Sequence, residues 1–310
     1  MIDVIIPLYN ARDTLARTLY SILLQKNVHE IKVTLVDDAS SCSYDDIIDQ
    51  FSKQLNLQYF RLEKNSGPGV ARQYGLDHTS APFFVFCDSD DVFYDCYSLR
   101  NLKDFLIDGG YDAVSGKVIE MSEKIFDCFV ARFDMLHGKM YSRSYLESHS
   151  IEFPPFYHSE DVGFNELWTA NLARLGFCDS NIVTVYVRRE GSLTTDDTYQ
   201  DIHVSSYLES QKWVVSYGEK HNVPPEGIAN VIYQAFVYMY SYFYGNLDDP
   251  DLKYLISMLP IFDQYYPFVQ EESKIETCSF WFNGMGHYSY LFTFREFLDY
   301  CRKRAGEENG

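Results

Sequence analysis

The stretch Phe83-Phe84-Val85-Phe86-Cys87-Asp88-Ser89-Asp90-Asp91 decides the fold class of this 310-residue chain. An unbroken apolar run that is followed at once by acids is typical of a strand buried on both faces of a sheet. Similar apolar runs end on polar residues at 4–10 (VIIPLYN) and at 31–38 (IKVTLVDD), and a further strand is predicted at 57–62. The first part of the chain is therefore predicted to build a sheet from buried strands.

Helical patterns lie between these apolar runs. Leucine and isoleucine recur at helical spacing over 15–23, a helix is predicted at 44–55, and Pro68 stands at the first position of a helix over 68–78. Strands and helices that alternate in this way form a parallel sheet with right-handed crossovers. Ligands of open α/β sheets bind beyond the carboxyl ends of the strands. The polar residues that end the apolar runs are therefore expected at one edge of the sheet, where acids suit a sugar nucleotide and its metal.

The pattern changes along the rest of the chain. Short strands and helices are predicted up to about residue 195, and from about residue 200 the pattern is helical and rich in tyrosine and phenylalanine. We place a boundary near residue 198, between an α/β domain, 1–198, and a helical region, 199–310, whose last residues, 302–310, are expected to be disordered. The predicted strands are 112–119, 126–131 and 181–187, and the predicted helices are 142–149, 159–174, 201–220, 227–245, 250–258 and 289–304.

The composition narrows the classes of partner and compartment. The formal net charge is −19, and such a field repels the phosphates of nucleic acids, which disfavours a nucleic-acid partner but still permits a local basic pocket. The 7 cysteines show no CxxC pair and no His/Cys cluster, so they indicate free thiols in a reducing compartment and not a zinc site. The apolar start of the chain is too short for a signal peptide. A cytoplasmic location is therefore expected.

The aromatic helical region, 199–310, has two interpretations. Its residues 228–244 are apolar, but they are slightly short for a bilayer span and are diluted by tyrosines. Aromatic residues at helical spacing, such as Tyr233, Phe236 and Tyr240, are typical of a core. They can also form a platform for sugars or for self-association. Roles in packing, acceptor binding, a homo-oligomer and peripheral membrane association therefore stay open.

Three motifs carry candidate chemistry. Residues 88–91 offer hard carboxylate oxygens to Mg²⁺ or Mn²⁺, to a ribose or to both, although an acidic turn after a strand has the same pattern. Residues 64–75 (KNSGPGVARQYG) open a helix whose N-terminus favours an anion, and Arg72 is expected to be free to reach a base or a phosphate, unless it is only a surface arginine. In the segment 158–161 (HSED), Ser159 is a predicted N-cap, and the acids that follow either interact with the helix dipole or include a general base.

Taken in order, the motifs of this chain resemble the inverting family 2 glycosyltransferases with the GT-A fold. The resemblance covers about residues 1–195. It implies a Rossmann-like mixed α/β sheet flanked by helices, followed here by the aromatic-rich α-helical region, and it implies hexosyl transfer to an acceptor hydroxyl with Mn²⁺ or Mg²⁺. The segments that carry it are VIIPLYN (4–10), LVDDAS (35–40), KNSGPGVARQYG (64–75), CDSDD (87–91), HGKMYSRSYL (137–146), SEDVGF (159–164) and RREGSLT (188–194).

The resemblance also implies roles for individual residues. Asp161 is the expected catalytic base, and Asp90 is the expected metal ligand. Asp38 and Arg72 are expected beside a uracil base, so the expected donor is a UDP-sugar, while a glycan, a lipid-linked intermediate and a polymer all stay open as acceptor. The other expected contacts of the nucleotide sugar are Pro7, Tyr9, Asp88, Ser89 and Arg189, the last of which stands where many members carry a histidine that helps to bind the metal or the diphosphate.

Two other functions are weighed against this one. A non-catalytic nucleotide-sugar-binding module would lack Asp161 or Asp90, and both are present. A nucleotidyltransferase of similar fold uses a glycine- and arginine-rich loop directly after the first strand, where this chain has Leu8-Tyr9-Asn10-Ala11-Arg12 without a glycine.

Overall fold

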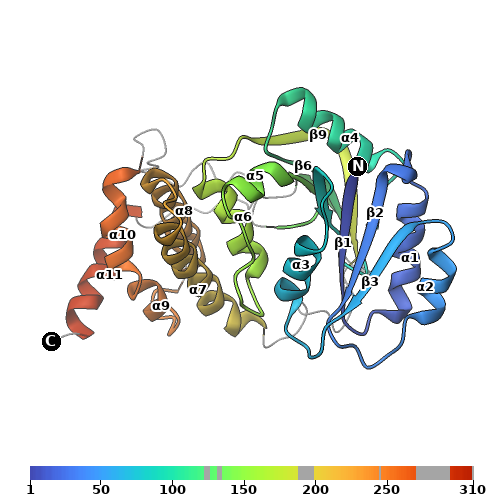
Figure 1. The fold of residues 1–310 in the computed structure, drawn as a ribbon. Coiled ribbons are helices and arrows are strands. Elements are labelled where there is room, and N and C mark those ends of the chain that lie inside the picture. The colour runs from blue at the N-terminus through green and yellow to red at the C-terminus, as the bar shows by residue number, and fades with distance from the viewer. Residues whose placement is uncertain (122–125, 131–134, 188–198, 244–245, 270–293, 309–310) are drawn as a thin grey trace. The chain divides into compact units, whose positions relative to one another are not determined.

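Two compact units make up the chain (Figure 1). The first unit holds residues 1–168 and 173–199, and the second holds residues 169–172 and 200–310. The computed structural model describes all residues except 122–125, 131–134, 188–198, 244–245, 270–293 and 309–310.

The first unit is built on one mixed 9-stranded sheet. Its order is β3-β2-β1-β4-β8-β6-β9-β5, and β7 pairs with β6. The first four strands of this order are parallel, as the alternating pattern predicted, whereas β8 joins β4 in the antiparallel sense and makes the sheet mixed. The strands are β1 Ile2–Leu8, β2 Ile31–Asp37, β3 Asn56–Arg61, β4 Phe83–Phe86, β5 Val92–Phe93, β6 Ala113–Met121, β7 Phe126–Val130, β8 Lys139–Ser142 and β9 Leu175–Val187.

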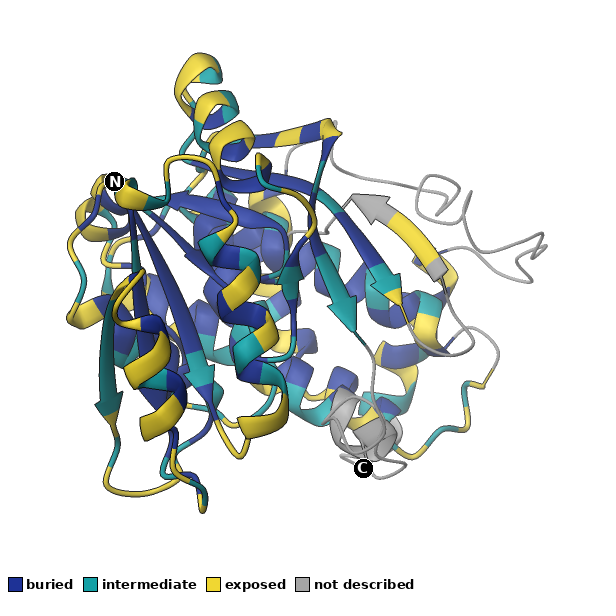
Figure 2. Ribbon diagram, turned by 90° about the vertical axis from the view of Figure 1, so that its right-hand side faces the viewer, coloured by how far each residue is buried: buried dark blue, intermediate teal, exposed yellow. Residues whose placement is uncertain are grey.

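Helices cover both faces of the parallel strands. Successive side chains of a strand alternate between the two faces of the sheet. On one face, Val4 and Ile6 of β1 belong to a buried cluster with residues of α1, α2 and α4. On the other face, Ile5 lies against Gly75 of α3. The strands of this sheet are mostly dark blue, and so buried, in Figure 2. The helices of the unit are α1 Arg12–Leu23, α2 Asp45–Phe51, α3 Pro68–Asp77, α4 Ser98–Gly109, α5 Arg143–Ser148 and α6 Glu160–Ala170, and a 3₁₀ turn, η1, spans Val28–Glu30.

An aromatic cluster fixes α6 on the same face of the sheet as α3. Phe86 is the strand partner of Ile5, and its ring lies 5.6 Å from Phe164 of α6, centroid to centroid. Phe153 stacks on Phe164 at 4.1 Å, and Tyr141 of β8 contacts the same ring at 5.6 Å. This packing brings the first turn of α6 to the carboxyl end of β4.

Two boundaries in the first unit differ from the sequence predictions. The helix predicted to reach residue 174 ends at Ala170, because Leu172 has a left-handed backbone, with φ of 61°. The strand predicted at 181–187 begins at Leu175, because residues 175–177 already pair in parallel with β6. Hydrophobic periodicity did not predict that residues 175–177 pair with β6. The register of the two strands shifts near Lys117, and such an irregularity interrupts the alternation of apolar and polar residues along the strand.

The second unit is helical, as predicted. Its aromatic residues form a core: Phe236, Tyr240 and Phe262 are almost fully buried, which confirms the core interpretation for these side chains. The chain end is not disordered up to residue 308, because α11 buries Phe297 and Cys301 on one side. The helices are α7 Tyr199–Lys220, α8 Pro225–Phe243, α9 Leu252–Ile256, α10 Leu259–Tyr265 and α11 Phe294–Glu308, and a 3₁₀ turn, η3, spans Tyr266–Phe268.

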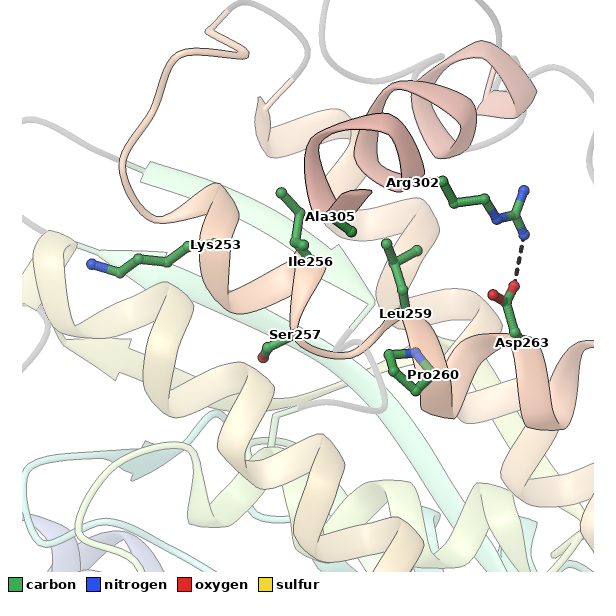
Figure 3. Close-up of a pocket in the computed structure, with 8 residues that line it drawn as sticks. All are labelled: Lys253, Ile256, Ser257, Leu259, Pro260, Asp263, Arg302 and Ala305. Atoms are coloured by element: carbon green, nitrogen blue, oxygen red, sulfur yellow. Dashed lines mark hydrogen bonds and ion pairs between the residues drawn. The ribbon is translucent and has the colours of Figure 1, made fainter. Parts of the chain in front are cut away.

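A groove of about 560 Å³ lies between α9, α10 and α11 (Figure 3). Apolar and polar side chains line it in equal number, and among them an ion pair of 2.7 Å joins Arg302 to Asp263. Among the described residues, no helix combines the length and the apolar character that a membrane crossing requires.

The contact between α3 and β1 leaves no room for a side chain at Gly75. A Cβ atom built there would lie 2.4 Å from Cγ2 of Ile5, a fully buried residue. We expect Gly75→Ala to lower the free energy of unfolding by about 1–3 kcal/mol, because an overpacked core must shift. The measurement is urea unfolding followed by circular dichroism. Gly306→Ala on α11 is the control, since a Cβ atom there meets nothing within 4 Å; equal stability of both variants would contradict the prediction.

Candidate active site

The ends of β1, β2 and β4 meet at one edge of the sheet, as the sequence predicted. The backbone amide of Asp38 donates to the carbonyl of Leu8 (2.8 Å), and the amide of Cys87 donates to the carbonyl of Ile5 (3.1 Å). Behind the acidic turn, the hydroxyl of Thr18 on α1 donates to the carbonyls of Ser89 and Asp91 at 3.0 and 2.7 Å. The acids at 37–38 and 88–91 therefore leave the two strands that flank β1, β2 and β4, at the same edge of the sheet.

The two acids that follow β2 have different tasks. Asp37 is fully buried, and its carboxylate accepts hydrogen bonds from the Ser40 amide (2.9 Å) and the Tyr59 hydroxyl (2.8 Å). Asp38 accepts from the backbone amides of Ser66 (2.7 Å) and Gly67 (2.8 Å). Asp37 thus stabilises the loop that follows β2, and Asp38 stabilises the residues that precede α3. Burial raises the pKa of Asp38, and the two amides oppose that shift.

Gly67 adopts the conformation that this entry requires. Its φ is +93°, a region that favours glycine, and a Cβ atom would lie 2.9 Å from Cδ2 of Tyr157. The predicted contact between Asp38 and a base stays a prediction, and a base would have to share this carboxylate with two amides.

Arg72 is not free, as the sequence interpretation had it, but is buried between two carboxylates. Its Nη1 lies 2.6 Å from Oε1 of Glu160, and its Nη2 lies 2.7 Å from Oδ1 of Asp88. Burial would raise the pKa of Asp88, but the charges of Arg72 and His137 hold it well below its usual range. Burial and the neighbouring Asp161 raise the pKa of Glu160 to about 7, against the charge of Arg72.

His137 joins the acidic turn, although the sequence analysis gave it no role. Its Nε2 lies 3.1 Å from Oδ2 of Asp91 and 3.5 Å from Oδ2 of Asp88. The ligand atoms of these three residues lie within 4.8 Å of one another. Asp91 is fully buried, and its Oδ1 accepts a hydrogen bond from the amide of Val187 at 3.3 Å.

The antiparallel register of β8 on β4 explains why His137 arrives there. Phe84 pairs with Tyr141, so the same register, continued beyond both strands, sets His137 across from Asp88. The signal in the sequence was a histidine at the start of the segment HGKMYSRSYL (137–146), but its partner could be found only from the strand pairing.

The donor set of this cluster fits a divalent cation. Two carboxylates and an imidazole suit Mn²⁺, which accepts nitrogen ligands more readily than Mg²⁺ does. The predicted ligand Asp90 is not one of the three residues of the cluster, although it belongs to the same turn; its backbone carbonyl accepts a hydrogen bond from Arg17 at 2.6 Å. Its role as a ligand stays a prediction.

The remaining predicted residues lie as follows. Asp161 is in the first turn of α6, and its Oδ1 accepts a hydrogen bond from the amide of Val162 at 2.9 Å. Ser89 is buried in the acidic turn, Pro7 is half-buried in β1, and Tyr9, directly after β1, is 50% exposed. Arg189 and the segment 188–194 lie outside the described residues.

Comparisons with known proteins agree with this arrangement. The family model described as Glycosyl transferase family 2 matches residues 3–157, half of the chain. TuaG of Bacillus subtilis strain 168, whose name describes it as a teichuronic acid biosynthesis glycosyltransferase, is 38% identical over 94 residues, which are 29% of this chain. The poly(ribitol-phosphate) beta-N-acetylglucosaminyltransferase TarS of Staphylococcus aureus strain Mu50 is 27% identical over 208 residues, or 61% of this chain. The matched stretches span 36% of the length of either relative.

A solved structure shares the fold. Residues 1–349 of S. aureus TarS, crystallised in complex with UDP-GlcNAc, superpose with a TM-score of 0.70 and 21% identity, and the match covers 88% of this chain and 82% of that one. The GT-A type of mixed α/β sheet that the sequence predicted is thereby confirmed.

The ion pair of His137 gives a pH-dependent prediction. Burial alone would lower the pKa of His137, but Asp91 and Asp88 raise it from 6.5 to about 10. A histidine whose pKa is raised on folding stabilises the fold fully below its unfolded pKa, and this contribution is lost as the pH rises through the folded pKa. We expect His137→Gln to lower the free energy of unfolding by about 3 kcal/mol at pH 6, because it leaves a buried carboxylate unpaired. The difference from the wild type should narrow between pH 6.5 and 10.

Urea unfolding at pH 6, 8 and 9.5 measures this difference. His29→Gln changes an exposed histidine and serves as the control. A difference between His137→Gln and the wild type that is the same at all three pH values would contradict the assignment of the imidazolium.

Proposed function

The chain belongs to glycosyl transferase family 2, and we propose that it moves a sugar from a UDP-sugar to an acceptor hydroxyl, with inversion at the anomeric carbon and with a divalent metal. The observation that carries this proposal is the buried link through Arg72. It joins Asp88, at the donor edge of the sheet, to Glu160, the residue before Asp161. This link supports a place for Asp161, the proposed base, close to the acidic turn 88–91, which would hold the donor.

In the proposed reaction, the acceptor oxygen attacks the anomeric carbon from the side opposite the nucleotide. Asp161 takes the proton of that hydroxyl as the new carbon–oxygen bond forms. The bond between the anomeric carbon and the diphosphate oxygen breaks in the same step, and UDP leaves with the bonding electrons. A single displacement inverts the anomeric configuration, so an α-linked donor gives a β-linked product.

The donor is proposed to lie over the carboxyl ends of the parallel strands. Pro7, Tyr9 and Asp38 would line the nucleobase, Asp88 and Ser89 would face the ribose, and Arg189 would face the diphosphate. Asp90 would hold the metal, and Asp88, Asp91 and His137 form a second set of candidate ligands within the same turn. A bound Mn²⁺ or Mg²⁺ neutralises charge that builds on the leaving diphosphate.

The acceptor is proposed to be a polymer. The names of the two relatives given above refer to teichuronic acid biosynthesis and to poly(ribitol-phosphate), both of which are polymers. A glycan or a lipid-linked acceptor would present the same attacking hydroxyl to Asp161.

Nucleotide binding tests the donor and the metal together. We expect calorimetry in the presence of Mn²⁺ to give at least tenfold tighter binding of UDP than of GDP or dTDP, and we expect excess EDTA to weaken the binding of UDP. Tighter binding of GDP would refute the proposed donor, and unchanged affinity in EDTA would refute the metal. Asp90→Ala and His137→Gln, compared at a series of Mn²⁺ concentrations, distinguish the two candidate ligand sets by which variant needs more Mn²⁺.

The base is tested by Asp161→Asn, which keeps the shape of the side chain and removes the proton acceptor. We expect normal UDP affinity and a loss of roughly 10²–10⁴-fold in turnover, the usual contribution of a general base. The readout is the release of UDP from UDP-sugars, with water as the acceptor where no other is known. Glu160→Gln should lose much less, and the reverse order of the two losses would place the base on Glu160.

A further inference from the structure

We propose that Arg72 and Glu160 are positioning residues that lock the first turn of α6 to the donor edge of the sheet, and that Arg72 does not contact the nucleobase. This inference rests on the proposed function, and it replaces the role that the family resemblance implied for Arg72. It concerns the geometry of the site, since neither side chain is assigned to a reacting atom.

Both terminal nitrogens of the Arg72 guanidinium already contact carboxylates. One of its terminal nitrogens contacts Glu160 at 2.6 Å, and the other contacts Asp88 at 2.7 Å. Its Nε is buried and has no hydrogen-bond partner among the described residues. The side chain of Arg72 is 7% exposed and that of Glu160 is 8% exposed. A base would therefore have to reach a buried guanidinium whose two terminal nitrogens already contact carboxylates.

The glycine-rich entry of α3 makes room for Glu160. A Cβ atom at Gly69 would lie 2.8 Å from Cγ and 3.0 Å from Cβ of Glu160, and 3.4 Å from the carbonyl oxygen of Pro154. The segment 64–75 thus provides both the space for the Glu160 side chain, at Gly69, and the cation that pairs with it, at Arg72. Gly69 belongs to the same contact as the ion pair, although it carries no charge.

Fixing Glu160 also fixes Asp161. The two residues are neighbours in the first turn of α6, so a movement of one carries the backbone of the other. A general base must hold the acceptor hydroxyl within hydrogen-bond distance, and misplacement by about 1 Å costs on the order of 10²-fold in rate. The planar fork of arginine can hold two carboxylates in fixed directions, whereas a lysine ammonium is a single point of charge.

Arg72→Lys tests the proposal, because it keeps the charge and removes the fork. We expect UDP affinity within twofold of the wild type by calorimetry, together with a loss of at least tenfold in the turnover of UDP release. A loss of UDP affinity as large as the loss of turnover would overturn the proposal in favour of a nucleobase contact, and so would the absence of any loss. Arg100→Lys, in an exposed ion pair of α4 with Asp104, is the matched control.

Gly69→Ala tests the same link without touching a charge. The methyl group displaces Glu160, so we expect turnover to fall at least fivefold while UDP affinity stays within twofold of the wild type. Gly306→Ala, where a Cβ atom meets nothing, is the control. Normal turnover of Gly69→Ala would contradict the proposal. If the wild type releases UDP from no UDP-sugar, the proposed function fails, and the UDP affinity of Arg72→Lys still decides whether Arg72 contacts the nucleotide.

Discussion

Five charged side chains, three of them buried and two half-buried, pair with one another at the edge of the sheet, and this pairing is the constraint on which the site depends. Arg72 and His137 lie among Asp88, Asp91 and Glu160. A charge that leaves water must find a partner of opposite sign in good geometry, and a missing partner is strongly destabilising. These residues come from the turn after β4, from α3 and α6, and from the segment before β8. The need to pair their charges therefore sets the relative positions of four parts of the first unit.

This constraint also explains how a strongly acidic chain gathers several carboxylates in one site. The chain carries a formal net charge of −19. The positive charges beside the acidic turn come from two side chains of the chain itself, Arg72 and His137. Asp88 is kept ionised by its two partners, while burial raises the pKa of Asp91 to about 6 despite His137. Neighbouring carboxylates of one turn thus differ in how readily they carry charge, and the difference comes from their surroundings.

The local parts of this arrangement could be predicted from the sequence, and the long-range parts could not. β1, β2 and β4 follow from apolar runs, and Pro68 marks the start of α3, because these signals depend on a few adjacent residues. The acids at 37–38 and 88–91 were placed at one edge correctly, since parallel strands align their carboxyl ends.

The partners of Arg72 lie 16 and 88 residues away, so no local pattern could show that its guanidinium is occupied. His137 was missed for the same reason, because its place depends on the pairing of β8 with β4. Residues 188–198 carry Arg189 and lie outside the described part of the chain.

The register of β8 restricts how the length of the segment between His137 and β8 can vary between related chains. Side chains alternate along a strand, so one residue inserted between His137 and Lys139 would turn the imidazole away from the acidic turn. An insertion upstream of His137 would leave the pairing of β8 and the direction of the imidazole unchanged. Length differences among relatives that keep this histidine are therefore expected before residue 137, and the single residue that separates it from the strand, Gly138, forms a spacer of fixed length.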